Sequence, residues 1–183
     1  MSKFPVIVNR TRHVLSKWAT VIDRDVMFFS GDAVHRYHSF DQLDYVSILA
    51  VNDDGLFPVV RQYRPSIEGF SWELPAGMVD SGDSPEQTCV RELQEETGLI
   101  ARQVITLGSY RPCTARLSNF IHAYFVVAEG RAVSPLPEEN IEARLVSYIE
   151  LKRMAVSGEM VLMPHVGTLF LAEANEEARR YLC

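Results

Sequence analysis

The segment GMVDSGDSPEQTCVRELQEETGL, residues 77–99, constrains the fold more than any other part of the sequence. Ser84 is a favourable helix N-cap, the proline after it suits the first helical position, and the glutamine three residues later completes a capping box. Gly98 stands where a helix end favours glycine. These signals predict a helix over residues 85–97.

One edge of the predicted helix is strongly acidic. At about 100° per residue, Glu92 and Glu96 lie one turn apart with Glu95 beside them. Like charges four residues apart destabilise a helix, and the helix dipole disfavours anions near its C-terminal end. Hard divalent cations such as Mg²⁺ take carboxylate oxygens, so this edge favours a cation site in which Arg91 orients a glutamate. If the three glutamates are considered without the rest of the segment, the alternative is an ordinary acidic helix face that is solvated and binds no cation.

The spacing around this helix resembles the signature of the Nudix hydrolases. That signature is a glycine, five residues, a glutamate, seven residues, and then Arg-Glu-U-x-Glu-Glu-x-Gly-U, with U aliphatic. The chain matches it at Gly77, Arg91, Glu92, Leu93, Glu95, Glu96, Gly98 and Leu99. Asp83 departs from it, because it replaces the first glutamate with a carboxylate that is one methylene shorter. Since the Arg-Glu-U-x-Glu-Glu portion is intact, we expect activity to survive.

The resemblance implies hydrolysis of a phosphoanhydride that links a nucleoside diphosphate to another group. In such enzymes two or three Mg²⁺ or Mn²⁺ ions bridge the phosphates and activate a water molecule. By position in the motif, Glu92 and Glu96 are expected to be the main metal ligands, with Glu95 nearby and the Ala76 carbonyl adding one oxygen. Glu95 and Arg91 are accordingly also candidates for a direct part in catalysis.

The residues before the motif narrow the resemblance to one branch of the family. RQYRP at residues 61–65 and WELPAG at residues 72–77 resemble the ADP-ribose and nucleotide-sugar pyrophosphatases. On that analogy Arg64 meets the substrate phosphates, which a guanidinium can bind bidentately, and Glu73 meets polar groups of the substrate. Arg61 is a further substrate-binding candidate, although a surface arginine is often only solvated.

The branch commonly carries its catalytic base, a glutamate, on a long loop after the last sheet hairpin. Here that loop is EGRAVSPLPEENIE, residues 129–142. Long loops inside compact domains are often functional. Glu139 is the first candidate for the base and Glu142 the second. The alternative is a hydrophilic loop with ordinary solvated acids.

A second loop, residues 111–119, bears on the substrate. ADP-ribose hydrolases tend to have a proline about fifteen residues past the motif, whereas this chain has Thr114-Ala115 there and Pro112 slightly earlier. Arg116 and the residues after it resemble the rest of that loop, which makes Arg116 a substrate-binding candidate. The branch assignment stands, and the particular sugar stays open.

The N-terminal residues read as short strands, at 13–22, 25–29 and 33–40. Three such strands make a poor core alone, so we expect them to pack on the main domain or on a second subunit. In the branch they form a small antiparallel β domain that is exchanged across a homodimer and helps build the adenine pocket. Trp18 is then a candidate for stacking on adenine, with a core position as the alternative. The expected domains are 1–42 and 43–183.

The remaining elements indicate the fold class. Residues 45–51 suit a buried strand, and the turn Asn52-Asp53-Asp54-Gly55 predicts a hairpin with a strand at 56–63. Further elements are expected to be strands at 71–74, 104–110, 120–127 and 143–149, a short helix from about Glu150 and a helix over roughly 165–181. Strands and helices without regular βαβ alternation favour an α/β/α sandwich with a mixed sheet.

Composition excludes several classes of protein. The chain has 183 residues and a net charge of −6, which argues against a nucleic-acid backbone binder. Its three scattered cysteines suggest neither a disulfide framework nor a zinc site. The N-terminus lacks the features of a signal peptide, and no apolar run approaches membrane-spanning length. We therefore expect a cytoplasmic protein with no membrane or nucleic-acid partner.

The leading hypothesis is a Mg²⁺- or Mn²⁺-dependent pyrophosphatase. It would split ADP-ribose or a related nucleoside diphosphate sugar into a nucleoside monophosphate and a sugar phosphate, and would act as a homodimer. One alternative is a Nudix enzyme for another diphosphate, such as a dinucleoside polyphosphate or a nucleoside triphosphate. Another is a non-catalytic nucleotide-sugar sensor, which the replacement at Asp83 motivates.

Overall fold

The computed structural model describes residues 5–29, 31–130 and 141–182. The chain divides into two compact units. The first combines Met1–Leu43 with Arg111–Phe120, and the second combines Asp44–Tyr110 with Ile121–Cys183. None of the helices within the described ranges is long and apolar enough to cross a membrane.

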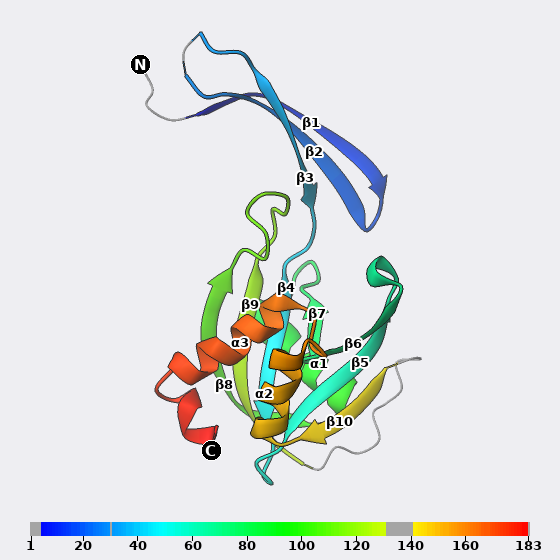
Figure 1. Cartoon of the computed structure of the whole chain (residues 1–183), viewed down its shortest axis with the longest axis vertical. Coiled ribbons are helices and arrows are strands. Elements are labelled where there is room, and N and C mark those ends of the chain that lie inside the picture. Colours follow the sequence, from blue (N-terminus) through cyan, green and yellow to red (C-terminus); the bar gives the residue numbers. More distant parts are fainter. Residues whose placement is uncertain (1–4, 30, 131–140, 183) are drawn as a thin grey trace. The chain divides into compact units, whose positions relative to one another are not determined.

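The first unit contains an antiparallel sheet in the order β1-β2-β3 (Figure 1). Its strands are β1 (Val6–Ser16), β2 (Ala19–Met27) and β3 (His35–Asp41). The expected single strand over 13–22 is wrong, because the chain turns at Lys17-Trp18 inside it. The Ser16 hydroxyl accepts a hydrogen bond from the Trp18 N–H at 3.1 Å, so a serine makes this turn where glycine or proline would have signalled it.

Residues 111–120 belong to the first unit because they attach to the free edge of β3. The Phe40 N–H donates to the Arg116 carbonyl at 2.7 Å, and the Ser118 N–H donates to the Phe40 carbonyl at 3.1 Å. Among the unit's described residues, Ile22 is the one buried apolar side chain. This small core agrees with the expectation that three short strands bury little by themselves.

The second unit holds two sheets (Figure 1). The four-stranded sheet has the order β7-β4-β9-β8, in which β4 and β9 are parallel and the other pairs are antiparallel. Its strands are β4 (Tyr45–Val51), β7 (Ala76–Met78), β8 (Ile100–Tyr110) and β9 (Ile121–Glu129). The three-stranded antiparallel sheet, in the order β10-β5-β6, consists of β5 (Phe57–Arg64), β6 (Gly69–Glu73) and β10 (Glu142–Val146).

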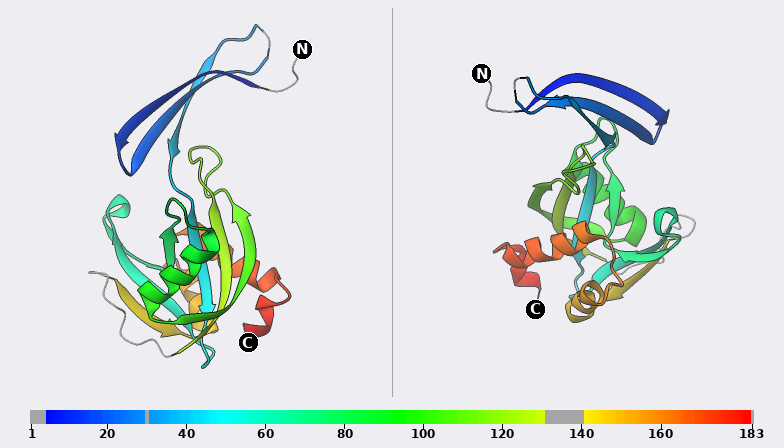
Figure 2. Two further views of the ribbon diagram at one scale, coloured as in Figure 1. Left: turned by 180° about the vertical axis from the view of Figure 1, so that it is seen from behind. Right: turned by 45° about the horizontal axis from the view of Figure 1, so that its top comes forward.

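Helices cover both faces of the mixed sheet. Alternation along β4 points Leu49 and Val51 into a core shared with α2 (Tyr148–Ser157) and α3 (Met163–Ala174). The alternate residues Val46, Ile48 and Ala50 pack in a second core against α1 (Pro85–Thr97), which crosses the other face (Figure 2). The expected α/β/α sandwich with a mixed sheet is therefore confirmed.

The expected β4–β5 hairpin is wrong, although its turn is present. The Asn52 side-chain oxygen accepts hydrogen bonds from the N–H groups of Asp54 and Leu56 at 3.1 and 2.8 Å. Beyond the turn, however, β5 pairs with β6 and β10, and β4 pairs with β7 and β9. A local turn signal fixes the chain reversal, but the buried apolar faces decide which strands pair.

The C-terminal elements differ from expectation at their ends. The strand expected to reach residue 149 stops at Val146, because Ser147 caps α2 and its hydroxyl accepts the Glu150 N–H at 3.2 Å. The helix expected over 165–181 is interrupted at Asn175, whose side chain accepts the N–H groups of the next turn. A short 3₁₀ helix, Ala178–Tyr181, follows. Strand β8 begins four residues earlier than expected, at Ile100 instead of residue 104.

Candidate active site

Helix α1 forms as the sequence predicts. The Ser84 hydroxyl accepts the Gln87 N–H at 3.2 Å, and the Gln87 side chain accepts the Ser84 N–H at 2.8 Å, which completes the capping box. Gly98 ends the helix with a φ of 73°. Leu93 is fully buried against the mixed sheet, which fixes the rotation of the helix about its axis. Glu92 and Glu96 therefore take defined positions.

The carboxylates of Glu92 and Glu96 lie against strand β7. Glu96 Oε2 accepts the Ala76 N–H at 3.0 Å, and its Oε1 accepts a hydrogen bond from Gln62 Nε2 at 3.3 Å. A β-carbon at Gly77 would stand 2.0 Å from the carboxyl carbon of Glu92. Both glutamates are buried, with 9% and 4% of their surface exposed. Two carboxylates that sequence spacing places one helical turn apart are thus gathered at one short strand.

These glutamates line a pocket of about 370 Å³ in the second unit. It contains five of the predicted site residues, Arg64, Glu73, Ala76, Glu92 and Glu96. It also contains Gly77 of the signature, together with residues that the sequence did not mark as part of the site, Tyr45, Gln62, Met78, Leu162 and His165. Gln62 could have been found, since strand alternation places it on the same face as Arg64. No local pattern marks His165, which comes from α3, far away in the sequence.

Arg64 and Glu73 form a bidentate ion pair in the pocket wall. Arg64 Nε and Nη2 donate to the two carboxylate oxygens of Glu73 at 2.8 and 2.5 Å. Burial favours the neutral form of Glu73, but the hydrogen bonds and charge of Arg64 outweigh it and hold the pKa of Glu73 below its usual value. Arg64 Nη1 donates to no other described residue, so it remains available to an anionic ligand. Burial, with the nearby charge of Glu73, raises the pKa of the Tyr45 hydroxyl to about 12.

Arg61 and Glu142 lie outside this pocket. Because successive strand residues face opposite sides, Arg61 points away from the side of Gln62 and stacks over the Phe70 ring at 4.5 Å. Its Nη1 lies 3.3 Å from Glu142 Oε2 in an exposed ion pair between β5 and β10. The other candidate for the catalytic base, Glu139, lies outside the described residues.

Arg91 and Glu95 occupy the exposed side of α1. Arg91 Nη1 lies 2.8 Å from Glu95 Oε2 and 2.9 Å from Glu92 Oε1, so one guanidinium links the outer glutamate to the pocket glutamate. Glu95 itself does not line the pocket. Asp83, the departure from the Nudix signature, is exposed in the turn before the helix and does not line it either.

The pocket fits a divalent cation that is bound together with phosphate. Within the described ranges, no group of three or more His, Cys, Asp or Glu side chains could hold a metal by itself. Mg²⁺, however, is usually bound through one or two carboxylates, with water and substrate phosphates completing its shell. The lack of a side chain at Gly77 leaves the space that the Glu92 carboxylate fills.

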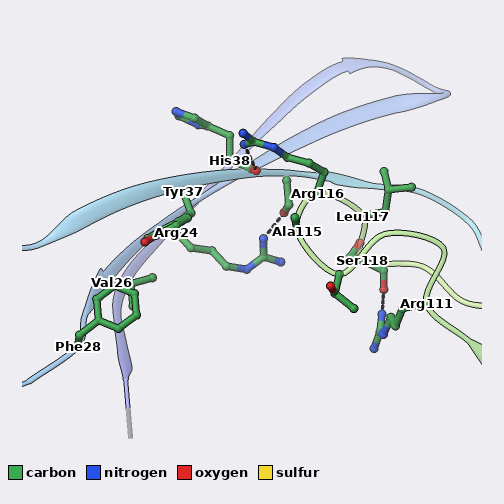
Figure 3. A pocket seen from close by; sticks show the side chains of 12 residues that line it. Arg24, Val26, Phe28, Tyr37, His38, Arg111, Ala115, Arg116, Leu117 and Ser118 are labelled. Atoms are coloured by element: carbon green, nitrogen blue, oxygen red, sulfur yellow. Dashed lines mark hydrogen bonds between the residues drawn. The ribbon is translucent and has the colours of Figure 1, made fainter. Parts of the chain in front are cut away.

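The first unit has a separate pocket of about 550 Å³, which contains Arg116 (Figure 3). Arg116 Nη1 donates to the His38 carbonyl at 3.3 Å, and Arg111 in the same pocket donates to the Ser118 carbonyl. Trp18 lies instead at the exposed β1–β2 turn, where Lys17 Nζ is 4.5 Å from its ring centroid. The alternative of a core position for Trp18 is therefore wrong.

Comparison with known proteins decides the family. A model described as the NUDIX domain matches residues 41–165, more than half of the chain. The chain belongs to the Nudix family. Its fold resembles a solved structure described as that of an ADP compounds hydrolase, with a TM-score of 0.77, 21% identity and 93% of both chains covered.

Individual relatives extend the comparison. The ADP-ribose pyrophosphatase of Mycobacterium tuberculosis is 36% identical over 86% of this chain and 77% of its own length. The ADP-ribose pyrophosphatase of Bacillus subtilis is 32% identical over 58% of this chain, and the match spans only 56% of that protein. A CMP-5'-(N-acetyl-N-hydroxy-3-aminopropyl)phosphonate hydrolase of Streptomyces rubellomurinus is 31% identical over 76% of this chain and 66% of its own length.

Proposed function

We propose that this Nudix protein is a Mg²⁺-dependent pyrophosphatase. Its substrate is ADP-ribose or a related nucleoside diphosphate sugar, and its products are a nucleoside monophosphate and a sugar phosphate. The observation that carries the proposal is the placement of Glu92 and Glu96 against β7, in one pocket with Arg64. Two relatives that are more than 30% identical are named ADP-ribose pyrophosphatases.

The reaction adds water across a phosphoanhydride. The water oxygen forms a bond to one phosphorus, the bridging P–O bond breaks, and the bridging oxygen leaves with the other phosphate. Glu92 and Glu96 would hold the divalent cation, and the Ala76 carbonyl would add an oxygen. When bound, Mg²⁺ or Mn²⁺ lowers the pKa of coordinated water and neutralises phosphate charge.

The chain's own residues position the substrate. Arg64 offers Nη1 to a phosphate oxygen while its bond to the buried Glu73 keeps the guanidinium oriented. The Tyr45 hydroxyl stays protonated across the physiological range and is a potential donor in the same pocket. The proposed catalytic base is Glu139 or, as the second candidate, Glu142. The proposed substrate contacts outside the pocket are Arg61, Arg116 and Trp18. Arg91 orients Glu92 and is itself tied to Glu95.

A substrate panel tests the proposal. The purified protein is incubated with Mg²⁺ or Mn²⁺ and with nucleoside diphosphate sugars, dinucleoside polyphosphates and nucleoside triphosphates, and the products are separated by chromatography. We expect the highest kcat/KM for a nucleoside diphosphate sugar and none after chelation of the metal. Lack of turnover of every diphosphate-linked compound would contradict the proposal, as would full activity of Glu96→Gln.

We also propose a cytoplasmic homodimer in which residues 1–42, to which residues 111–120 attach, are the dimerisation subdomain and the rest of 43–183 is the hydrolase domain. Support comes from the first unit's small core and from apolar side chains exposed on β1, which include Val6, Val14 and Leu15. Light scattering of the full chain at micromolar concentration checks the assembly. A monomeric mass across the concentration range would exclude it.

A further inference from the structure

His165 is a buried polar side chain that the mechanism above does not use. It lies in the first turn of α3, has no exposed surface, and lines the pocket that holds Arg64, Glu73 and the two glutamates of α1. An apolar side chain would fill such a position without the cost of burying an imidazole. Its polar atoms therefore need an explanation.

One ring nitrogen has a clear structural partner. The Leu74 N–H donates a hydrogen bond to His165 Nδ1 at 3.1 Å. A backbone amide can only donate, so Nδ1 must present its lone pair, and in the neutral ring the proton must then be on Nε2. Burial lowers the pKa of His165 to about 4, despite the opposing effect of Glu73, so the ring is neutral at physiological pH. Nε2 is consequently a fixed hydrogen-bond donor.

The other ring nitrogen has no partner in the described part of the chain. Nε2 is buried and accepts or donates no hydrogen bond there. Buried donors in native proteins are nearly always satisfied, and each exception asks for a ligand, a water or a functional reason. His165 lines the substrate pocket, so an occupant of that pocket is the nearest source of an acceptor, provided that its binding displaces the atoms that now cover Nε2.

We propose that His165 is a substrate-binding residue, whose Nε2–H donates a hydrogen bond to an oxygen of the bound diphosphate compound. The inference rests on the proposed function for the nature of the occupant. The Leu74 N–H acts as the positioning group, because it fixes the ring's tautomer and orientation. Leu74 comes directly before Pro75 and Ala76, so the same contact joins α3 to the segment on which the carboxylates lie.

Two substitutions separate the two ring nitrogens. His165→Asn places an amide oxygen near the position of Nδ1, so it keeps an acceptor for Leu74 and removes the distal donor. His165→Gln places an amide NH₂ near the position of Nε2, so it keeps the distal donor and removes the acceptor for Leu74. The pair serves as its own matched control, because both variants lose the ring and keep an amide.

Steady-state kinetics and thermal unfolding of both variants test the proposal. We expect His165→Asn to raise KM about 10-fold or more with a melting temperature close to that of the wild type. We expect His165→Gln to keep KM within about 3-fold while it melts at a lower temperature. The reverse order of the two variants in KM, or an unchanged KM in His165→Asn, would show a purely structural role and overturn the proposal.

Calorimetric binding of ADP-ribose keeps this test separate from that of the proposed function. Wild-type affinity in His165→Asn, in a chain that still hydrolyses the compound, overturns the role of His165 and leaves the function intact. Binding that is weakened about 10-fold in His165→Asn, in a chain without turnover, supports the role and overturns the function. Absence of binding to the wild type overturns both.

Discussion

The carboxylate of Glu92 fills the space beside Gly77 that a β-carbon would occupy. The ideal β-carbon position is 2.0 Å from the carboxyl carbon and 2.1 Å from Oε1 of Glu92. Gly77 is not among the glycines with positive φ, so its backbone conformation is open to other residues. The glycine that begins the Nudix signature therefore leaves the space that this carboxylate takes, and a larger residue would displace the carboxylate.

We predict that Gly77→Ala displaces the Glu92 carboxylate and lowers kcat/KM on the order of 100-fold, as misplacement of a reacting group by about 1 Å can do. Initial rates with a nucleoside diphosphate sugar and Mg²⁺ measure the effect. Gly167→Ala is the control, because nothing lies within 4 Å of its β-carbon and its φ is not in the left-handed region. Equal activity of the two variants would contradict the spatial argument.

We predict different losses at Glu96, which lines the pocket, and at Glu95, which does not. Glu96→Gln should reduce kcat on the order of 100-fold or more, since it removes a buried carboxylate proposed to hold the cation. Glu95→Gln should reduce kcat by roughly 10-fold, because Glu95 is outside the pocket and reaches it through Arg91. Activity as a function of Mg²⁺ concentration should show a larger rise in the metal requirement for Glu96→Gln. Matching metal curves would refute this division of roles.

We predict that Arg64→Ala destabilises the fold as well as weakening substrate binding. It leaves the carboxylate of Glu73, which is 2% exposed, without its bidentate partner. Arg64 is itself 41% exposed, so we expect a loss of about 1–3 kcal/mol, below that of a fully buried pair. Urea unfolding measures it. The control Arg102→Ala breaks the exposed pair with Asp53 and should cost about 0–1 kcal/mol. A similar loss in both would show that burial of Glu73 matters little.

We predict that stability falls with acid over the range set by His165. Its pKa is about 4 in the folded chain and 6.5 for the free side chain. Between these values the unfolded chain binds the proton and the folded chain does not, so unfolding becomes easier as the pH falls from 6.5 toward 4. The loss should be roughly 3 kcal/mol. Urea unfolding at several pH values should show a shallower slope for His165→Gln, and an unchanged slope would contradict the assignment.

The parts of the structure that the sequence predicts well are those set by local chemistry. The bounds of α1 follow from the Ser84 cap and Gly98, because each acts within one helical turn. The approach of Glu92 and Glu96 follows from helical periodicity in the same way. The turn after β4 was likewise evident from Asn52.

What the sequence does not predict is set by contacts between distant segments. Strands β4 and β5 belong to two different sheets because of the apolar faces that meet in the folded chain. The turn between the two strands does not determine with which strand each of them pairs. His165 enters the pocket because α3 packs behind β4, where Thr168 Oγ1 lies 2.8 Å from Ser47 Oγ. The turn at Lys17-Trp18 lacks the glycine or proline that usually marks a reversal.

The attachment of residues 111–120 to β3 makes the first unit discontinuous in sequence. The chain crosses between its two units three times, after Leu43, after Tyr110 and after Phe120. Any chimera that exchanges the N-terminal sheet with that of another Nudix protein must therefore transplant the β8–β9 connection as well. An N-terminal truncation alone would strip residues 111–120 of the strand edge to which they bond.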